Sequence, residues 1–514
     1  MIRLAELLAA ISLATDLGRG FPQEKALRTC LVANRIAEEL GLDENERGDV
    51  FYAALIHPLG CTAFTYEAAR VVGTNELKGI PAYMRVDAAR PTEGIRAMLE
   101  EVRGEPIARR ARALFKNMTS GKAFLDYVVR ADCEAGINFT RRIGLGDSVA
   151  RLVAHVHERW DGKGLPAGLA GDEIVLGARI VVLADQVELF HRGDGRNETG
   201  AMVRRRSTGW FDPAVADAFE RCAEQVFAEL DAGSVWDAVL AAEPLPNVTI
   251  LDGRVDELAA ALADVVDLKS PYFLGHARGV ALLSESAAAH LGLGDDACAA
   301  VRRAALVHDV GRVGVSNLVW DKPGPLTASE WEQVRLHAYH TERILTRSSV
   351  LLPFAQIAGM HHERMDGSGY HRGLTAAAIP IEARVLAAAD VFHALTERRP
   401  HRPPVGPEQA AEVLETMISA GTLDPEAARA VCECAGVALR RGRTSGPWPA
   451  GLTDREVDVL RLLALGNSKK EIAKALVIAP GTVHTHTVHI YEKLGISTRA
   501  GAALFATEHG LVRR

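Results

Sequence analysis

Several patterns that would point to other classes of protein are missing from the 514 residues of this chain. No run of 18 apolar residues occurs, so we expect no membrane-spanning helix. The first residues include Glu6 and lack the basic, apolar and cleavage segments of a signal peptide. The seven cysteines show no disulfide-framework spacing, which favours a reducing cytoplasm. A glycine-rich loop ending in Gly-Lys-Ser/Thr is also absent, which argues against nucleoside triphosphate hydrolysis of the P-loop kind.

Strand-like alternation of apolar and polar residues is scarce as well. Apolar residues instead recur every three or four positions, for example over 26–42 and 49–57, which predicts helices. Hydrophobic residues make up 48% and charged residues 24% of the chain, as is usual for a soluble globular protein. The net charge of −7 argues against a protein that coats nucleic acid along its whole length, but not against one basic module. We therefore expect an all-α, cytoplasmic protein.

One helical unit occurs twice in the sequence. Residues 25–42 align with 276–293 at an offset of 251 positions. Residues 157–169 align with 362–374 at an offset of 205, with eight identities in thirteen positions. Because the two offsets differ, the first copy must have a longer middle section, which we place within 62–155.

The repeat and two breaks divide the chain into domains. A proline-rich break at 243–247 separates the two copies. A stretch rich in glycine, proline and charge follows the second copy and is typical of a linker. We predict the following division: a first helical domain at 1–245, a second at 250–440, a linker at 441–451 and a compact helical domain at 452–514.

Residue types that bind metals concentrate in the second copy. The set comprises His276, His308, Asp309, His337, His361, His362 and Asp390. Neutral imidazole is the commonest metal ligand in proteins, and this composition suits more than one divalent ion. We expect His276, His308 and Asp390 to close on one cation. Asp309 would then bridge to a second cation held by the remaining three histidines.

Such a centre would have a defined chemistry. Two metals that share a carboxylate lower the pKa of a bridging water and hold the attacking and leaving oxygens of a phosphoester. The arginines at 312, 399 and 402 are candidates for binding phosphate oxygens. The first copy lacks most of the ligands: Lys25, Pro58, Asp132 and Val156 stand opposite His276, Asp309, His337 and His361. We therefore expect the first domain to be a metal-free scaffold or sensing unit.

The second copy resembles the HD-GYP family of metal-dependent phosphodiesterases over about 254–435. The motifs that carry the resemblance are His308-Asp309-x-Gly311, His337, His361-His362-Glu363-x-x-Asp366-Gly367-x-Gly369-Tyr370 and Ala389-Asp390. The family implies a helical fold, a centre of two transition-metal ions (commonly iron or manganese) and hydrolysis of cyclic di-GMP. Together with the internal repeat, this predicts tandem HD-type helical domains, of which the first is degenerate. The seven ligand positions above inherit the metal roles, and His308, Asp309 and Arg312 the catalytic ones. The implied substrate contacts are Asp366, Gly369, Tyr370, Arg399 and Arg402.

Three positions depart from the family pattern. Arg312 stands where a lysine is expected, which keeps the charge but changes its geometry. His371 replaces the proline of the name motif. Tyr272 stands where some members carry an additional acidic ligand, so the resemblance implies two metals rather than three.

Residues 452–511 resemble the LuxR/FixJ-type helix-turn-helix family. The resemblance rests on Leu452-Thr453-x-Arg455-Glu456, Gly466-Asn467-Ser468-Lys469-Lys470-Glu471-Ile472-Ala473, Thr482-Val483-x-x-His486 and Ile490-Tyr491-x-Lys493-Leu494-Gly495. Helices are expected from Thr453, over 469–476, over 480–494 and over 499–509. From residue 449 on there are nine Lys/Arg and six Asp/Glu, which gives a charge of +3. The preceding residues contain 50 Lys/Arg and 60 Asp/Glu, which gives −10. A basic module on an acidic body fits phosphate contact at this end.

Within this module, the expected DNA contacts come from the second and third helices. They are Lys469, Lys470, Thr482, Val483, His484, His486 and Lys493. The family implies DNA binding as a homodimer. Two hypotheses for the whole chain remain open. In one, the second domain hydrolyses a cyclic dinucleotide or another phosphoester and is coupled to DNA binding. In the other, it is a non-catalytic sensor of a nucleotide or metal that controls the DNA-binding end.

Overall fold

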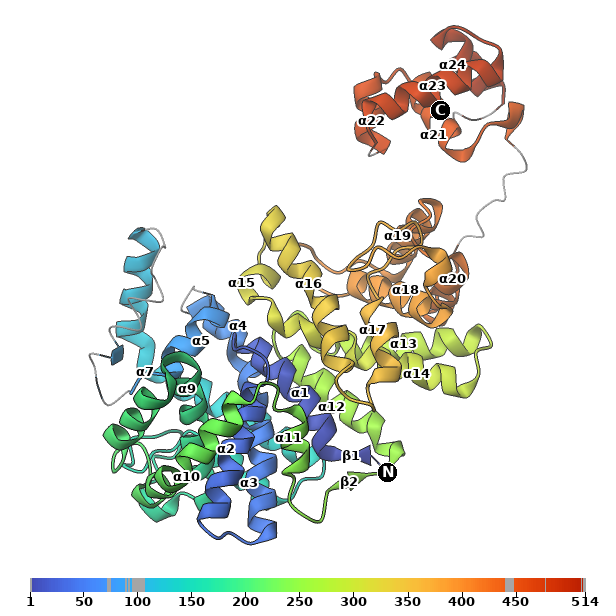
Figure 1. The fold of residues 1–514 in the computed structure, drawn as a ribbon. Helices are drawn as coiled ribbons and strands as arrows, with labels where there is room; N and C mark the ends of the chain where they lie inside the picture. Colours follow the sequence, from blue (N-terminus) through green and yellow to red (C-terminus); the bar gives the residue numbers. More distant parts are fainter. Residues whose placement is uncertain are drawn as a thin grey trace. The chain divides into compact units, whose positions relative to one another are not determined.

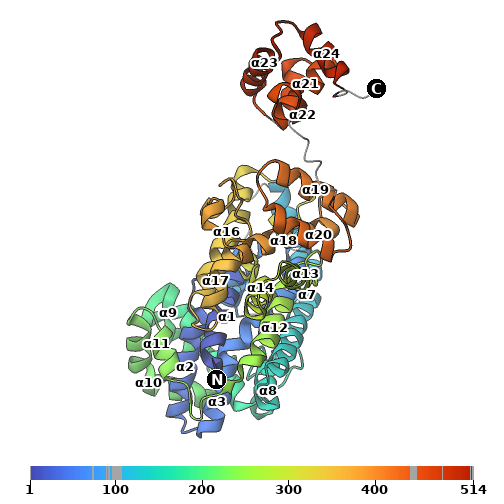
Figure 2. The same ribbon diagram turned by 90° about the vertical axis from the view of Figure 1, so that its right-hand side faces the viewer.

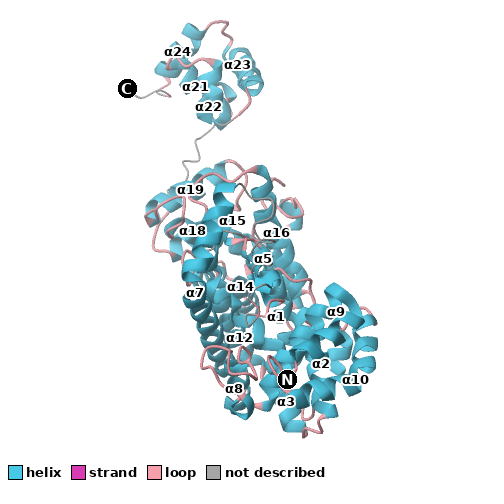
Figure 3. Cartoon of the chain, turned by 90° about the vertical axis from the view of Figure 1, so that its left-hand side faces the viewer, coloured by secondary structure: helices cyan, strands magenta, loops and turns pink. Residues whose placement is uncertain are grey.

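The computed structural model describes residues 2–71, 75–87, 90, 93–94, 107–439, 448–476, 478–509 and 511. It is built almost entirely of helices, which confirms the predicted all-α class (Figure 3). Residues 1–437 form one compact unit and residues 438–514 another. No helix among the described residues has the length and apolar character needed to cross a membrane. Residues 441–447 of the predicted linker lie outside the described residues.

Among its described residues, the first half of the large unit has a short strand and ten helices that precede the second copy (Figure 1). Their bounds are β1 Ile2–Arg3, α1 Leu4–Gly18, α2 Lys25–Glu39, α3 Glu44–Ile56, α4 Thr65–Val71, α5 Glu76–Met84, α7 Ile107–Arg142, α8 Asp147–His155, α9 Leu176–Arg206, α10 Pro213–Asp231 and α11 Trp236–Ala241. Two 3-10 turns join them, η1 His57–Phe64 and η2 Gly171–Glu173. The long helix α7 occupies the middle section that the two alignment offsets predicted.

The second half repeats this order. Its elements are β2 Thr249–Ile250, η3 Asp252–Arg254, α12 Val255–Asp267, α13 His276–His290, α14 Asp295–Val307, η4 Val310–Gly314, α15 Asn317–Trp320, α16 Ala328–Leu345, α17 Leu352–Gly359, η5 Ala376–Ala378, α18 Ile381–Thr396, α19 Pro407–Ser419 and α20 Pro425–Cys434. The bounds of α13 and α14 are those of α2 and α3 moved by 251 positions. Likewise, α18 begins 205 positions after α9. The internal repeat is therefore a repeat of structure.

The two copies pack against each other inside the large unit. β1 pairs antiparallel with β2, so the start of the chain lies beside the segment between the copies. Helix α12 contacts α7, and the two run side by side in Figure 2. Helix α1 contacts α2 and α3 of its own copy and also η4 and α16 of the second. The boundary between predicted domains 1–245 and 250–440 stays a prediction, since the structure joins both in one unit.

In the part of the small unit that the structure describes, the short turn η6 Pro449–Gly451 is followed by four helices. These are α21 Asp454–Ala464, α22 Lys469–Leu476, α23 Pro480–Leu494 and α24 Arg499–Glu508, close to the bounds expected from the sequence. Thr453 caps α21 in a reciprocal capping box with Glu456, which explains why that helix begins there. The core of the unit includes the fully buried Val457, Ile472 and Val483.

Candidate metal centre

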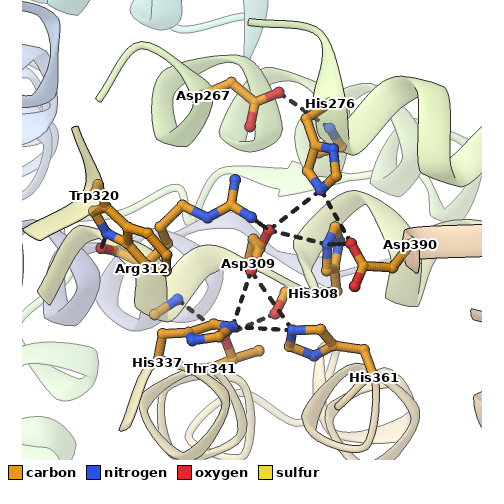
Figure 4. Close-up of polar contacts among 12 residues, drawn as sticks. Asp267, His276, His308, Asp309, Arg312, Trp320, His337, Thr341, His361 and Asp390 are labelled. Atoms are coloured by element: carbon orange, nitrogen blue, oxygen red, sulfur yellow. Dashed lines mark hydrogen bonds and ion pairs between the residues drawn. The ribbon is translucent and has the colours of Figure 1, made fainter. Parts of the chain in front are cut away.

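Helices far apart in the sequence deliver the predicted ligands to one place (Figure 4). His276 begins α13, and Asp390 lies in α18. His308 and Asp309 follow α14 directly, where the helix gives way to η4. The other three are His337 in α16 and His361 and His362 just after α17. All are buried except His362, which is partly exposed.

Asp309 occupies the middle of this cluster. One carboxylate oxygen, Oδ2, lies 3.0 Å from Nε2 of His308 and 3.6 Å from Nε2 of His276. The other, Oδ1, lies 3.3 Å from Nε2 of His337 and 3.6 Å from Nε2 of His361. The two oxygens of a single carboxylate therefore face two different sets of imidazoles.

Each set contains three side chains at the spacing of metal ligands. His276, His308 and Asp390 form one set, with Oδ1 of Asp390 3.3 Å from Nε2 of His276 and 3.8 Å from that of His308. His337, His361 and His362 form the other, and the ligand atoms within each set all lie within 4.8 Å of one another. We refer to them as the first set and the second set. The structure thus brings together all seven predicted ligands.

The backbone fixes the orientation of three of these imidazoles. Nδ1 of His308 donates to the carbonyl of Ala305 at 2.6 Å, and Nδ1 of His361 donates to that of Ala358 at 2.7 Å. His337 makes the same contact three residues back, with Val334. Each bond leaves Nε2 as the nitrogen that points into the centre, a tautomer that suits metal ligation.

His276 is oriented differently, because it begins its helix and has no carbonyl one turn back in α13. Its Nδ1 donates instead to Oε2 of Glu397 at 2.9 Å. Glu397 is held in turn by Arg399 at 2.7 Å and lies 3.3 Å from Nδ1 of His393. Sequence reasoning missed Glu397. The sequence signal that could have indicated this residue is its position two helical turns beyond Asp390, where a carboxylate can reach the same cluster.

The donor set fits metal ions. Three buried atoms that point into the centre make no hydrogen bond within the described structure: Nε2 of His276, Nε2 of His308 and Oδ1 of Asp309. Nε2 of His337 and Nε2 of His361 lie 3.1 Å apart, an arrangement that suits two lone pairs directed at one cation. Buried polar atoms without partners are costly, so a group that accepts their lone pairs would stabilise the fold.

Asp309 has a large electrostatic influence on its neighbours in this cluster. Burial acts to raise the pKa of this carboxyl, but Arg312 and His308 hold it well below its usual range. Burial opposes protonation of His308, yet Asp309 raises its pKa to about 10. Burial and the neighbouring His308 lower the pKa of His361 to about 3. The second set is therefore ready to offer neutral imidazoles, whereas His308 must lose a proton when a metal binds.

Arg312 lies against the bridging position. Its Nη2 contacts Oδ2 of Asp309, and its guanidinium lies 4.0 Å from the ring centroid of Phe273. Trp320 packs 5.4 Å from the same guanidinium and donates from Nε1 to the backbone carbonyl of Arg312. Nε and Nη1 of Arg312 are buried and have no hydrogen-bond partner among the described residues.

The other predicted substrate contacts are placed less uniformly. Tyr370 lies beside the second set, its ring 4.7 Å from that of His362. Asp366 is exposed and accepts from the backbone and hydroxyl of Ser368, so it shapes the loop. At Gly369 a Cβ would lie 2.4 Å from the nitrogen of Arg364, so glycine is required there by packing. Arg402 donates from both terminal nitrogens to backbone carbonyls at the end of α18, which leaves those nitrogens engaged.

In the first copy a lysine takes the place of a ligand. Nζ of Lys25 contacts Oδ1 of Asp185, the position that corresponds to Asp390, and both side chains are buried. Nε2 of His57 lies 3.4 Å from the same oxygen. The carboxylate that faces a histidine pair in the second copy is thus neutralised by an internal ammonium group.

The small unit exposes only some of the predicted DNA contacts. Lys469, Lys470, Thr482 and His484 are exposed, and His486 is partly exposed. Val483 is fully buried in the core, so the expectation that its side chain contacts DNA is wrong. Lys493 is exposed, and its ammonium group donates to Glu456 at 2.6 Å. Five other described residues of α23 are also exposed, which are Gly481, Thr485, Val488, His489 and Glu492.

Comparisons with known proteins agree with this geometry. The family model described as HD domain matches residues 127–215 and 260–427, and that of the luxR family of bacterial regulatory proteins matches 450–506. The 3'3'-cGAMP-specific phosphodiesterase 3 of Vibrio cholerae is 30% identical over 427 residues, which cover 82% of this chain and 92% of that protein. The cyclic di-GMP phosphodiesterase of Thermotoga maritima is 39% identical over 144 residues, 28% of this chain and 39% of that protein.

A solved structure supports the same assignment. The crystal structure of a cyclic GMP-AMP-specific phosphodiesterase of Vibrio cholerae matches with a TM-score of 0.59 and 27% identity. The match covers 85% of this chain and 98% of that one, so it spans both copies of the repeat. The chain belongs to the HD-GYP family of HD-domain metal-dependent phosphohydrolases and carries a luxR-family helix-turn-helix domain at its C-terminal end.

Proposed function

We propose that the second half of this chain hydrolyses a 3'3'-linked cyclic dinucleotide at a centre of two divalent transition-metal ions, with iron or manganese as the preferred metals. The observation that carries the proposal is the position of Asp309, whose two oxygens face two separate sets of three ligands. A carboxylate in that position suits the bridge between two ions. Metal ions held there would polarise a phosphoryl oxygen and lower the pKa of a water.

The protein residues supply binding and charge around this centre. Arg312 offers two unpartnered N–H groups beside Asp309 to the phosphate oxygens. Glu397 and the backbone carbonyls hold the imidazoles in the tautomer that presents Nε2. Tyr370 presents its ring next to His362, where a nucleobase can stack. Asp366 and Gly369 act on the loop and support the site indirectly.

Cyclic GMP-AMP is the first substrate to test, because the relative that covers most of this chain is named for that nucleotide. Cyclic di-GMP is the second, because two relatives that match smaller parts of this chain are named for that nucleotide. Purified manganese-loaded protein should hydrolyse one of them to a linear product, and Asp309→Asn should not. His157→Ala in the first copy is the matched control and should keep full activity. If wild-type protein with two bound metals cleaves neither nucleotide, the sensor hypothesis replaces this one.

We also propose that the small unit binds DNA and responds to the nucleotide. The exposed residues Lys469, Lys470, Thr482 and His484 on α22 and α23 support this part. A ligand alters DNA affinity only if it binds two states of the protein differently. We expect cyclic nucleotide to change DNA affinity about 5- to 150-fold, the usual size of such coupling. A titration with and without nucleotide, for the full chain, tests it; superimposable curves would mean two independent activities.

A further inference from the structure

We infer that the first copy is an internal scaffold of the metal centre, and that Glu76 is the positioning residue through which it acts. Glu76 begins α5 in the first half, yet its carboxylate is bonded to the second half. It holds in place residues 310–320, the segment that carries Arg312. This inference rests on the proposed function only for its effect on turnover, because its structural part is measurable without substrate.

Three groups of the second half surround the Glu76 carboxylate. Oε2 accepts from the hydroxyl of Ser316 at 2.6 Å, and Oε1 accepts from the backbone N–H of Asn317 at 2.7 Å. Nζ of Lys269 lies 3.4 Å from Oε1. Glu76 is 4% exposed and Lys269 is 0% exposed, so this ion pair is shielded from water. A buried carboxylate with these contacts ties α5 firmly to the start of α15.

Helix α15 passes this constraint on to the centre. Its last residue, Trp320, donates to the carbonyl of Arg312 at 3.1 Å. The Trp320 ring lies 5.7 Å from that of His337 and 5.5 Å from that of Phe273, on which Arg312 also packs. Figure 4 shows Trp320 and Arg312 side by side next to Asp309. A shift of α15 would therefore move the guanidinium that faces the reacting phosphate.

Helix α1 holds the same segment from another side. A Cβ at Gly314 would lie 2.7 Å from Cδ2 of Leu17, and a Cβ at Gly18 would lie 3.1 Å from that of Val313. The two elements approach so closely that η4 has no room to move toward α1. Residues 310–320 are thus fixed at one end by α1 and at the other by Glu76, and both come from the first half.

This arrangement accounts for a copy that has lost its ligands but kept its helices. Lys25 neutralises Asp185 within the first copy, so that copy is stable without a metal of its own. Its remaining contact with the chemistry is mechanical, through α1 and α5. The first copy is therefore a component of the active centre rather than a separate sensing domain.

The test uses the full chain with Glu76→Gln, which keeps one of the two acceptor oxygens and leaves the buried Lys269 without a counter-charge. A second variant, Glu76→Gln with Lys269→Met, removes both charges and guards against a failure to fold. Glu188→Gln is the matched control, because Glu188 is also buried in the first half, and its ion-pair partners among the described residues are Arg28 and Arg192 of the same half. Amide hydrogen exchange over 315–320 is measured on metal-free protein, and turnover of cyclic GMP-AMP and of cyclic di-GMP on manganese-loaded protein.

We expect the backbone amides of 315–320 to exchange roughly 10-fold faster in both Glu76 variants. We also expect kcat to fall about 10- to 100-fold at unchanged metal stoichiometry, because a small misplacement of a group in an active centre costs that much. Glu188→Gln should change neither. Wild-type exchange in both variants, or equal losses in the control, would overturn the inference. If the wild-type protein turns over no nucleotide, the proposed function fails and the exchange data alone decide whether Glu76 holds the segment.

Discussion

Glu397 offers a sharp test of how the first ligand set is organised. Three of the buried histidines use backbone carbonyls to orient their rings, but His276 depends on the 2.9 Å bond to Glu397. Glu397→Ala should leave Nδ1 of His276 without an acceptor and let the ring turn away from Asp390. Loss of such an outer partner typically lowers metal affinity 10- to 100-fold, or about 1.4–2.8 kcal/mol.

The structure predicts that this loss falls on one of the two metals. The first set includes His276, whereas the second set is His337, His361 and His362, none of which contacts Glu397 in the described structure. Calorimetric titration of metal-free protein with manganese should therefore show one weakened site and one unchanged site. Glu397→Gln should lose less than Glu397→Ala, because its amide oxygen still accepts from the imidazole.

The control is Glu408→Ala, an exposed carboxylate in the first turn of the next helix, α19. It should bind both metals as the wild-type protein does. Unchanged affinity at both sites of folded Glu397→Ala protein would refute the orienting role. Equal weakening of both sites would refute the division into two sets around Asp309.

Three further predictions concern the first copy and the small unit. Lys25→Ala should lower the free energy of unfolding by about 3 kcal/mol or more, because it leaves Asp185 buried without its cation. The metal content should not change; chemical denaturation measures the stability and metal analysis the content. Lys470→Ala should weaken binding to every DNA sequence and reduce the salt slope by about 1, while His484→Ala should alter sequence preference; binding titrations at several salt concentrations distinguish the two. Val483→Ala should destabilise the small unit by roughly 1–3 kcal/mol without a specific change in base preference, which thermal unfolding and competition binding measure.

Local signals explain why the helix bounds of the small unit were predictable. The Thr453–Glu456 capping box and the glycines after α21 and α23 act within a few residues, so the sequence carries them openly. The internal repeat similarly revealed that α2 and α13 are equivalent. The density of histidine and aspartate in the second copy predicted the ligands, and the structure places these residues in one cluster.

Features that depend on tertiary packing could not be predicted from the sequence. Glu397 contacts His276 across 121 positions, and Glu76 contacts Asn317 across 241, so no local pattern could reveal either bond. Val483 was grouped with Thr482 by its motif, although the helical period places it on the buried face with Thr487 and Ile490. Arg402 appeared as a phosphate ligand because its charge is visible in the sequence but its carbonyl partners are not.

Metal-edge anomalous diffraction from manganese-loaded full-length protein would show whether Asp309 bridges two metal ions. We expect two peaks in the second half, one beside each oxygen of Asp309, between the first set and the second set. No peak should lie between His57 and Asp185, where Lys25 supplies the positive charge. A single peak, or two peaks of which only one lies beside Asp309, would show that Asp309 does not bridge two metal ions.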